Sequence, residues 1–307
     1  ALDITDPASP KYLWEISPST AGYQELGETW STPQVGKIKY GSGEKWVVFV
    51  GGGYDENQDS SNPSADSKGR AIYAIDVLTG SLLWCYSYAE NAAMTYSIPS
   101  DIAKVDIDGN GNIDRLYVGD MGGRMWRFDI GDSDPTKWTG KIIFNSNLTS
   151  NDRRKIFYPP DVTLENDMGN YEMLLFGTGD RERPKESVII NRLYAVKDKS
   201  LSTILKENDL VDVTQDVLQD PNATNNEKMA VLRALKEKYG WYITLDPGEK
   251  CLSSPVVFYK VTYYSTFSPT VVSGTDPCQV GEGNGKIYSL TYKTGNAAFN
   301  LDLLNDN

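Results

Sequence analysis

The sequence contains no histidine among its 307 residues. This excludes histidine-based acid–base catalysis, a Ser-His-Asp triad, histidine-ligated haem and most catalytic zinc sites. The chain also has no apolar run long enough to span a bilayer and no secretory signal at its start. Residues 1–7 instead look like the interior of a larger protein, so we expect a fragment or a processed domain.

Basic side chains are outnumbered, with 30 Lys and Arg against 42 Asp and Glu, which gives a net charge of −12. This balance argues against nucleic acid and against anionic membrane as principal partners, because both repel an acidic surface. We therefore expect no nucleic-acid partner and no membrane insertion. The charge suits a soluble surface with affinity for divalent cations.

Cysteine is also scarce, with only three residues in the chain, and their spacing does not match a metal site. Cys251 and Cys278 lie in one repeat and can form a disulfide across a loop if the compartment is oxidising. Cys85 would then be unpaired or would pair outside this sequence. The alternative is three buried, reduced thiols.

Oxygen-bearing side chains occupy every second position of segment 106–114, with glycines between them. This alternation lets a tight turn direct its oxygens towards one ion, as in the first part of a calcium loop. The glycines permit the positive-φ conformations that such a turn needs. The predicted ligands are Asp106, Asp108, Asn110, Asn112 through its carbonyl, and Asp114.

The loop departs from the EF-hand pattern, because Tyr117 stands where an EF-hand has its bidentate Glu. The flanking segments 101–105 and 115–119 are β-rich, so we expect a β-hairpin whose turn wraps the ion. The alternative is a turn of Asx residues that binds nothing. Three carboxylates this close repel one another without a cation, and flexible oxygen cages suit Ca²⁺ better than Mg²⁺.

A four-strand unit recurs along the chain. Each unit has a strand pair, an aromatic-centred strand, a polar turn containing Gly or Asp, and an outer strand. Such repeats predict an all-β fold, a modified, quinoprotein-like β-propeller, with an open sandwich or barrel as the alternative. The aromatic-centred strands are expected near residues 69–76, 122–129, 191–196 and 285–290.

We expect residues 1–307 to form one propeller domain, whose ring is not obviously closed by four units. Residues 1–28 are interpreted as the end of a preceding blade and a linker. Residues 201–240 interrupt the β pattern as a helical insertion between blades. A capping box at Thr224 and Glu227, followed by apolar residues at helical spacing, predicts a helix over about 225–239.

The order of these features resembles the C-terminal domain of the PilC/PilY family of type IV pilus tip-associated adhesins. The resemblance rests on the repeats, on the loop 106–114 running into Arg115-Leu-Tyr-Val-Gly-Asp120, and on Phe176-Gly-Thr-Gly179. It also includes Gly240-Trp-Tyr-Ile-Thr-Leu245 with Gly248-Glu249, and Thr266-Phe-Ser-Pro-Thr270 before Cys278. It spans residues 30 to 292.

The resemblance implies a calcium-binding domain that governs pilus extension against retraction and supports surface adhesion. It implies export to the pilus tip or bacterial cell surface. The implied partners are minor pilins, an N-terminal adhesin region outside this sequence, and a host or abiotic surface. The family's ligand positions fall on the five residues predicted above. The chain has no Arg-Gly-Asp tripeptide, so integrin binding is not supported.

Two other functions compete with this one, although we expect the chain not to be an enzyme. The unit 71–84 also resembles repeats of quinoprotein dehydrogenases, for which Asp180 and Arg181 are the nominated site residues. A generic extracellular propeller would bind carbohydrate or matrix through loops such as 52–66, which is also a candidate second ion site. The acidic segment 129–134 is interpreted as an ordinary turn.

Overall fold

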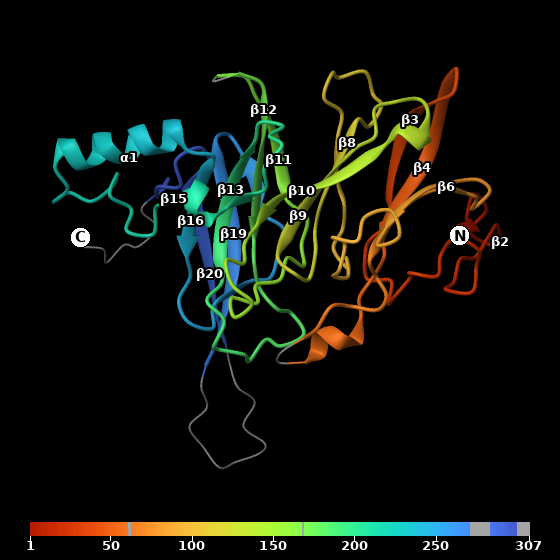
Figure 1. Ribbon diagram of the computed structural model, residues 1–307, viewed down its shortest axis with the longest axis horizontal. Helices are drawn as coiled ribbons and strands as arrows, with labels where there is room; N and C mark the ends of the chain where they lie inside the picture. The colour runs from red at the N-terminus through yellow and green to blue at the C-terminus, as the bar shows by residue number, and fades with distance from the viewer. Residues whose placement is uncertain (61–62, 168, 271–282, 300–307) are drawn as a thin grey trace, which may run out of the picture. The chain divides into compact units, whose positions relative to one another are not determined.

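The computed structural model describes residues 1–60, 63–167, 169–270 and 283–299 (Figure 1). The chain divides into two compact units. The first comprises Ala1–Gly122 and Trp126–Lys141, and the second comprises Gly123–Met125 and Ile142–Asn307. Within the described ranges, no helix is both long and apolar enough to cross a lipid bilayer.

Antiparallel sheets make up most of the fold, as the repeated units predicted. The first sheet has the order β3-β4-β5-β6, which is also the order of these strands along the chain. A separate short hairpin, β1–β2, precedes it. The bounds are β1 Leu2–Asp3, β2 Lys11–Tyr12, β3 Gln34–Tyr40, β4 Gly43–Gly51, β5 Ala71–Asp76 and β6 Leu82–Ser87. Residues 13–28 contain no strand, and β2 pairs only with β1.

The second and third sheets each repeat the four-strand order and add a fifth short strand. Their orders are β14-β10-β9-β8-β7 and β11-β12-β13-β16-β15. The second sheet contains β7 Ala103–Val105, β8 Arg115–Gly119, β9 Arg124–Asp129, β10 Thr139–Asn145 and β14 Leu205–Lys206. The third contains β11 Asp161–Glu165, β12 Tyr171–Gly177, β13 Arg192–Asp198, β15 Val211–Asp212 and β16 Gly240–Thr244.

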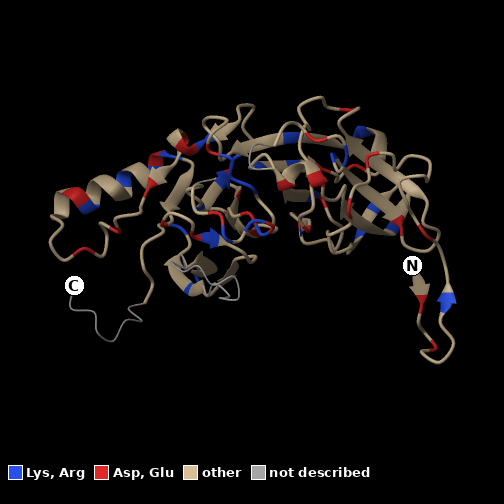
Figure 2. Ribbon diagram, turned by 90° about the horizontal axis from the view of Figure 1, so that it is seen from below, with Lys and Arg blue, Asp and Glu red and all other residues tan. Residues whose placement is uncertain are grey.

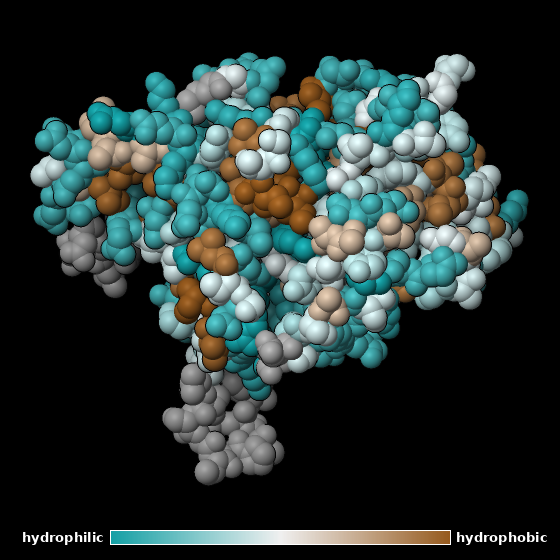
Figure 3. Space-filling view, viewed as in Figure 1, coloured by the Kyte–Doolittle hydropathy of each residue, from teal (hydrophilic) through white to brown (hydrophobic). Residues whose placement is uncertain are grey.

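The fourth sheet is built around its long central strand, which pairs with β17 and β18 on one side and with β20 on the other. Its strands are β17 Lys250–Cys251, β18 Val256–Phe258, β19 Val261–Pro269 and β20 Gly283–Thr291. One face packs inward through Thr262 and Tyr264, while the other exposes Val256 and Ile287. Figure 3 shows apolar surface over the β19–β20 region, whereas hydrophilic side chains cover most of that view.

The turn between β5 and β6 explains the sequence pattern that marks each repeat. The Asp76 carboxylate accepts hydrogen bonds from the amides of Leu78 and Thr79, both at 2.9 Å, and so closes the turn. Lys45 Nζ lies 2.8 Å from the same carboxylate. The Lys45 contact, reinforced by the two amide bonds, outweighs burial and lowers the pKa of Asp76 to about 2.

Aromatic side chains pack successive sheets together inside each unit. In the first unit, the Trp84 ring of β6 meets Phe128 and Trp138 in edge-to-face contacts, with ring centroids 5.9 and 5.3 Å apart. In the second unit, Phe144 meets Phe176 and Tyr194 in the same geometry. Trp84 is therefore a packing residue between sheets.

The predicted helix is confirmed as α1, Asn225–Glu237, with the capping box of Thr224 and Glu227 in place. Its position differs from the expectation, because β13 pairs directly with β16. The helical insertion therefore belongs to the connection between β13 and β16, two neighbouring strands of the third sheet. It does not connect one sheet to the next. Sequence spacing could not show this, since the strand that follows the helix reads equally well as the start of a new repeat.

The helix contacts its unit through only some of the apolar residues that stand at helical spacing. Met229 and Leu232 are exposed, whereas Leu235 is buried, with Val231 and Ala234 packed beside it. Only the C-terminal turns of α1 therefore dock on the sheet, and Figure 1 shows the remainder of the helix extending away from the strands.

A buried lysine fixes the docked end of α1. Lys197 Nζ donates to the carbonyl oxygens of Leu235, at 2.6 Å, and Lys238, at 3.2 Å, which belong to the last turn. A cation at a helix C-terminus is favourable because the unpaired carbonyls concentrate negative partial charge there. Burial works against the charge, and together with nearby Lys199 it lowers the pKa of Lys197 to about 8.

This pKa predicts how stability depends on pH. Between pH 8 and 10.5 the unfolded chain holds the Lys197 proton and the folded chain releases it, so folding is favoured as pH rises. The free energy of unfolding of the wild type should rise relative to that of Lys197→Met by on the order of 3 kcal/mol across this range. Urea unfolding of both proteins at pH 7, 8, 9 and 10 measures the difference. A difference that stays constant with pH would contradict the assignment.

Candidate metal centre

The segment 106–114 is the turn of the β7–β8 hairpin in the first unit. Val105 and Arg115 are the last paired residues of the two strands, and the amide of Asp114 donates to the carbonyl of Val105 at 2.9 Å. The chain therefore leaves β7, turns within a few residues and returns in register. The structure confirms the β-hairpin setting that the flanking residues predicted, and it differs from the helices of an EF-hand.

The turn is organised around the carboxylate of Asp106. The amides of Gly109 and Gly111 donate to it at 2.8 and 2.6 Å, and that of Asn110 does so at 3.2 Å. Partial burial raises the pKa of Asp106, but these amide bonds outweigh it and hold the pKa below its ordinary value. The loop therefore favours the charged form of this carboxyl group.

The other acidic side chains converge on the same place. One carboxylate oxygen from each of Asp106, Asp108 and Asp114 lies within 4.8 Å of the others, the only such cluster of three or more potential metal-binding side chains in the described residues. Asp114 also accepts from the amide of Ile107 at 2.9 Å, which holds its carboxylate over the turn. Three of the five predicted ligands are thus brought together by their side chains.

The two amide residues of the prediction behave differently from each other. Asn110 lies in the turn, where its Oδ1 accepts from the amide of Asn112 at 2.8 Å. The Asn112 side chain is buried, and its Nδ2 donates to Glu44 at 2.9 Å. Its Oδ1 has no hydrogen-bond partner in the described part of the chain. The proposed ligand atom of Asn112, its main-chain carbonyl, stays a prediction.

Two glycines make the turn possible. Gly109 and Gly111 have φ of +74° and +88°, a region that other residues enter only at a cost of about 1–2 kcal/mol. These conformations turn successive amides inward, towards Asp106. The positive φ of both glycines was predictable from the sequence, because the requirement depends only on neighbouring residues.

Residues from the first sheet contact the loop, and no pattern near the loop predicted these contacts. The amide of Ile113 donates to the main-chain carbonyl of Lys37 at 2.8 Å, so the loop pairs with the edge strand β3. Lys39 Nζ lies 3.9 Å from Asp108 and 3.8 Å from Asp114. Glu44, which holds Asn112, also pairs with Lys37 Nζ at 2.8 Å. The loop is therefore braced against the β3–β4 hairpin.

The residues present fit a hard cation. The donor set is carboxylate and amide oxygen, which Ca²⁺ prefers, and the same loop contains a buried polar atom without a described partner, Asn112 Oδ1. Figure 2 shows acidic and basic residues interspersed along the ribbon. The cluster is thus a local concentration of negative charge within a mixed charge pattern.

The other acidic segments considered from the sequence are satisfied by the protein itself. In the loop 52–66, the Asp55 carboxylate accepts from the amides of Asn57, Ser67 and Lys68. In the segment 129–134, Asp134 caps a short 3₁₀ helix, Pro135–Lys137, as expected of an ordinary turn.

The residues nominated for the quinoprotein alternative make separate ion pairs. Asp180 is paired with Lys155 at 2.8 Å, while the side chain of Arg181 is about half exposed and lies 3.8 Å from Glu182.

Cys251 is buried and its Sγ donates to the carbonyl of Ser253 at 3.4 Å. Cys278 lies outside the described residues, so the predicted disulfide stays a prediction.

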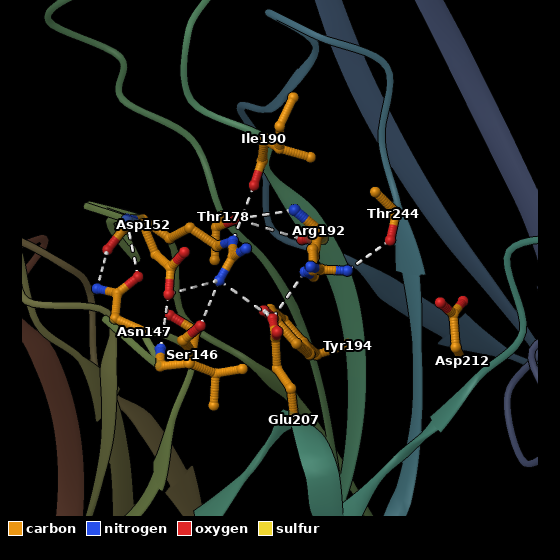
Figure 4. A network of polar contacts seen from close by, with 12 residues as sticks. Ser146, Asn147, Asp152, Thr178, Ile190, Arg192, Tyr194, Glu207, Asp212 and Thr244 are labelled. Carbon is orange, nitrogen blue, oxygen red and sulfur yellow. Dashed lines mark hydrogen bonds and ion pairs between the residues drawn. The ribbon is translucent and has the colours of Figure 1, made fainter. Parts of the chain in front are cut away.

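The second unit contains a buried ionic network around Glu207 (Figure 4). Its carboxylate lies 3.1 Å from Arg154 and 2.7 Å from Arg192, and the Tyr194 hydroxyl donates to it. Asp152 lies 3.9 Å from Arg154. Two guanidinium groups therefore face two carboxylates, and the charges balance inside the protein. We assign this network a structural role in holding η3, Glu207–Asp209, against β13.

The successive four-stranded antiparallel sheets, joined in chain order, define a β-propeller with an acidic loop in one inner hairpin. The comparisons with known proteins identify the family to which this propeller belongs. The family model for the PilY1 beta-propeller domain matches residues 1–183. The chain therefore belongs to the PilY1 beta-propeller domain family, as the resemblance in its sequence predicted.

Relatives and a solved structure agree with this assignment. A type IV pilus biogenesis factor PilY1 homolog of Xylella fastidiosa is 24% identical over 97% of this chain. The type IV pilus biogenesis factor PilY1 of Pseudomonas aeruginosa strain UCBPP-PA14 is 23% identical over 98% of it. The crystal structure of the P. aeruginosa PilY1 C-terminal domain superposes with a TM-score of 0.69 at 20% identity, covering 96% of this chain and 64% of that chain.

The chain spans only part of these proteins, 21% of the Xylella relative and 29% of the Pseudomonas one. The structural likeness at this identity establishes the propeller fold.

The loop geometry predicts the effect of filling a glycine position. An added Cβ at Gly109 meets no atom within 4 Å, so Gly109→Ala should cost only the positive-φ conformation, about 1 kcal/mol in the free energy of unfolding. Gly43→Ala is the matched control, since its Cβ also has open space and its φ is not positive. Urea unfolding in chelator measures both. Equal stabilities for the two variants would contradict the loop conformation.

Proposed function

We propose that this chain is a calcium-binding propeller domain that supports type IV pilus biogenesis, acting in the balance between pilus extension and retraction. Membership of the PilY1 family supports the pilus assignment, since the relatives are named type IV pilus biogenesis factors. The observation that carries the calcium assignment is the convergence of Asp106, Asp108 and Asp114 on one turn of that propeller.

In this proposal the ion is held by the Asp106, Asp108 and Asp114 carboxylates, the Asn110 side chain and the Asn112 carbonyl. Such a set contributes three negative charges at a flexible turn, which suits the larger Ca²⁺ better than the strictly octahedral Mg²⁺. When bound, the ion neutralises the mutual repulsion of the three carboxylates. An affinity of roughly 10⁻⁷–10⁻⁴ M is expected for a loop of this kind.

The protein's own contacts explain how occupancy could reach beyond the loop. Without calcium, repulsion between Asp108 and Asp114 opposes the closed turn and loosens the hairpin. Ordering the turn fixes the amide of Ile113 on the carbonyl of Lys37, and fixes Asn112 on Glu44. Calcium thus favours one arrangement of the β3–β4 edge, which is a population shift between two local states.

The partners proposed for this edge belong to the pilus. They are minor pilins and the N-terminal adhesin region of the longer protein, with a host or abiotic surface as the object of adhesion. The proposed location is the pilus tip or cell surface, after export. Family membership supports these proposals, and the net charge of −12 gives no reason to add a nucleic-acid partner.

Calorimetric titration tests the binding proposal. Wild-type protein should bind one Ca²⁺, and Asp114→Ala should bind it roughly 100-fold more weakly, because a charged and partly buried ligand is lost. At a free calcium concentration about 100 times the Kd, the ion should stabilise the wild type by about 2.7 kcal/mol.

Asp132→Asn is the matched control, since it removes the same charge from a neighbouring turn in which Asp132 accepts from the amide of Asp134. It should bind calcium with nearly wild-type heats. Indistinguishable heats from the wild type and Asp114→Ala would remove the assignment of the site.

A cellular measurement tests the biological part. Bacteria carrying Asp114→Ala in the full-length protein should show altered surface piliation at equal protein level, whereas those carrying Asp132→Asn should resemble the wild type. Electron microscopy and sheared-pilin quantification give the readout. Unchanged piliation in a variant that no longer binds calcium would contradict a role of the site in extension and retraction.

A further inference from the structure

The three loop carboxylates are not neutralised equally by the protein. Asp106 accepts three main-chain amide bonds, so its charge is stabilised within its own turn. Asp108 and Asp114 instead share one cation, Lys39, which comes from β3 and lies 3.9 and 3.8 Å from their oxygens. These separations are longer than a direct charge-assisted hydrogen bond of about 2.7–2.9 Å. Lys39 therefore balances both charges without binding tightly to either.

Another hairpin of the same chain shows what a closely paired lysine looks like. The β11–β12 hairpin is the counterpart of β7–β8 in the third sheet, and it also carries acidic residues at its turn. There Lys293 Nζ lies 2.7 Å from Glu165 and 2.8 Å from Asp167. Lys293 thus pairs directly with both carboxylates of one acidic hairpin, whereas Lys39 lies farther from the carboxylates of the loop 106–114.

We propose that Lys39 is the resident counter-ion of the loop and that calcium displaces it from Asp108 and Asp114. Lys39 thereby sets the calcium affinity of the site. This inference rests on the proposed calcium function and adds a residue that lies outside the loop. Without the charge of Lys39, the same ligands would bind calcium more tightly.

The surroundings of Lys39 suit this exchange. Its side chain is 39% exposed, so the ammonium group can move into water without a large desolvation cost. The Asp114 side chain is only 14% exposed, so charges near it interact more strongly than in bulk water. A fixed ammonium this close to a bound divalent ion would be repelled, so the two cations cannot both stay beside these carboxylates.

The same arrangement predicts selectivity. Because Lys39 already supplies one positive charge, a monovalent ion gains little by replacing it. A divalent ion gains an additional charge in contact with the three carboxylates. The loop should therefore respond to calcium against a background of sodium, and the contribution of Lys39 should weaken at high ionic strength.

The test is calcium titration by calorimetry of the wild type, Lys39→Gln and Lys39→Arg at low and at 1 M ionic strength. Lys39→Gln should bind calcium about tenfold more tightly at low ionic strength, and the gain should shrink in 1 M salt. Lys39→Arg keeps the charge and should stay within about threefold of the wild type.

Lys45→Gln is the matched control. It removes the same charge from the neighbouring strand β4, but Lys45 Nζ pairs with Asp76 at a different turn, so its effect on calcium binding should be well below tenfold. A second readout is thermal unfolding. In chelator, Lys39→Gln should melt below the wild type, because Asp108 and Asp114 lose their counter-ion, while calcium should raise its melting temperature by more.

The outcomes separate the two proposals. If the wild type binds calcium and Lys39→Gln binds it equally or more weakly, the role of Lys39 is overturned while the site stands. If Lys45→Gln tightens binding as much as Lys39→Gln, the effect comes from general charge and the specific role of Lys39 is also overturned. If the wild type does not bind calcium at all, the proposed function fails and this inference fails with it.

Discussion

The constraint on which the rest of the loop depends is the mutual repulsion of three carboxylates held within 4.8 Å of one another. The chain meets it in two ways that the structure shows: main-chain amides turned towards Asp106 by Gly109 and Gly111, and the ammonium group of Lys39 near the other two. Both leave negative charge at the turn. In our proposal a divalent ion neutralises this remaining charge, and Lys39 sets how tightly that ion binds.

The β framework holds these charges in place. The hairpin register brings Asp106 and Asp114 to the two ends of one turn, and the pairing of Ile113 with Lys37 fixes the loop to the edge strand β3. Further along the first unit, Trp84 packs against Phe128 and Trp138. The acidic turn therefore stands on a hairpin that is braced by an edge strand, within a unit that aromatic packing holds together.

Features that depend on neighbours in sequence were predictable. The acidic turn, its glycines, the repeated strands and the capped helix all follow from short patterns. Features that depend on distant partners were not, such as the contact of Asn112 with Glu44, 68 residues away, or the pairing of Glu207 with Arg154. The exposed Met229 and Leu232 show the same limit, since helical spacing cannot tell which turns of α1 meet the sheet. Only the β13–β16 pairing shows that the helix belongs to the connection between two strands of one sheet.

The most direct test of the central claim is a crystal structure of the chain grown in calcium, with anomalous diffraction data. The account predicts one anomalous peak among Asp106, Asp108 and Asp114, with oxygen ligands at about 2.3–2.6 Å and the Lys39 ammonium moved away from it. Ordinary water between those carboxylates, at saturating calcium and with Lys39 still in place, would contradict it.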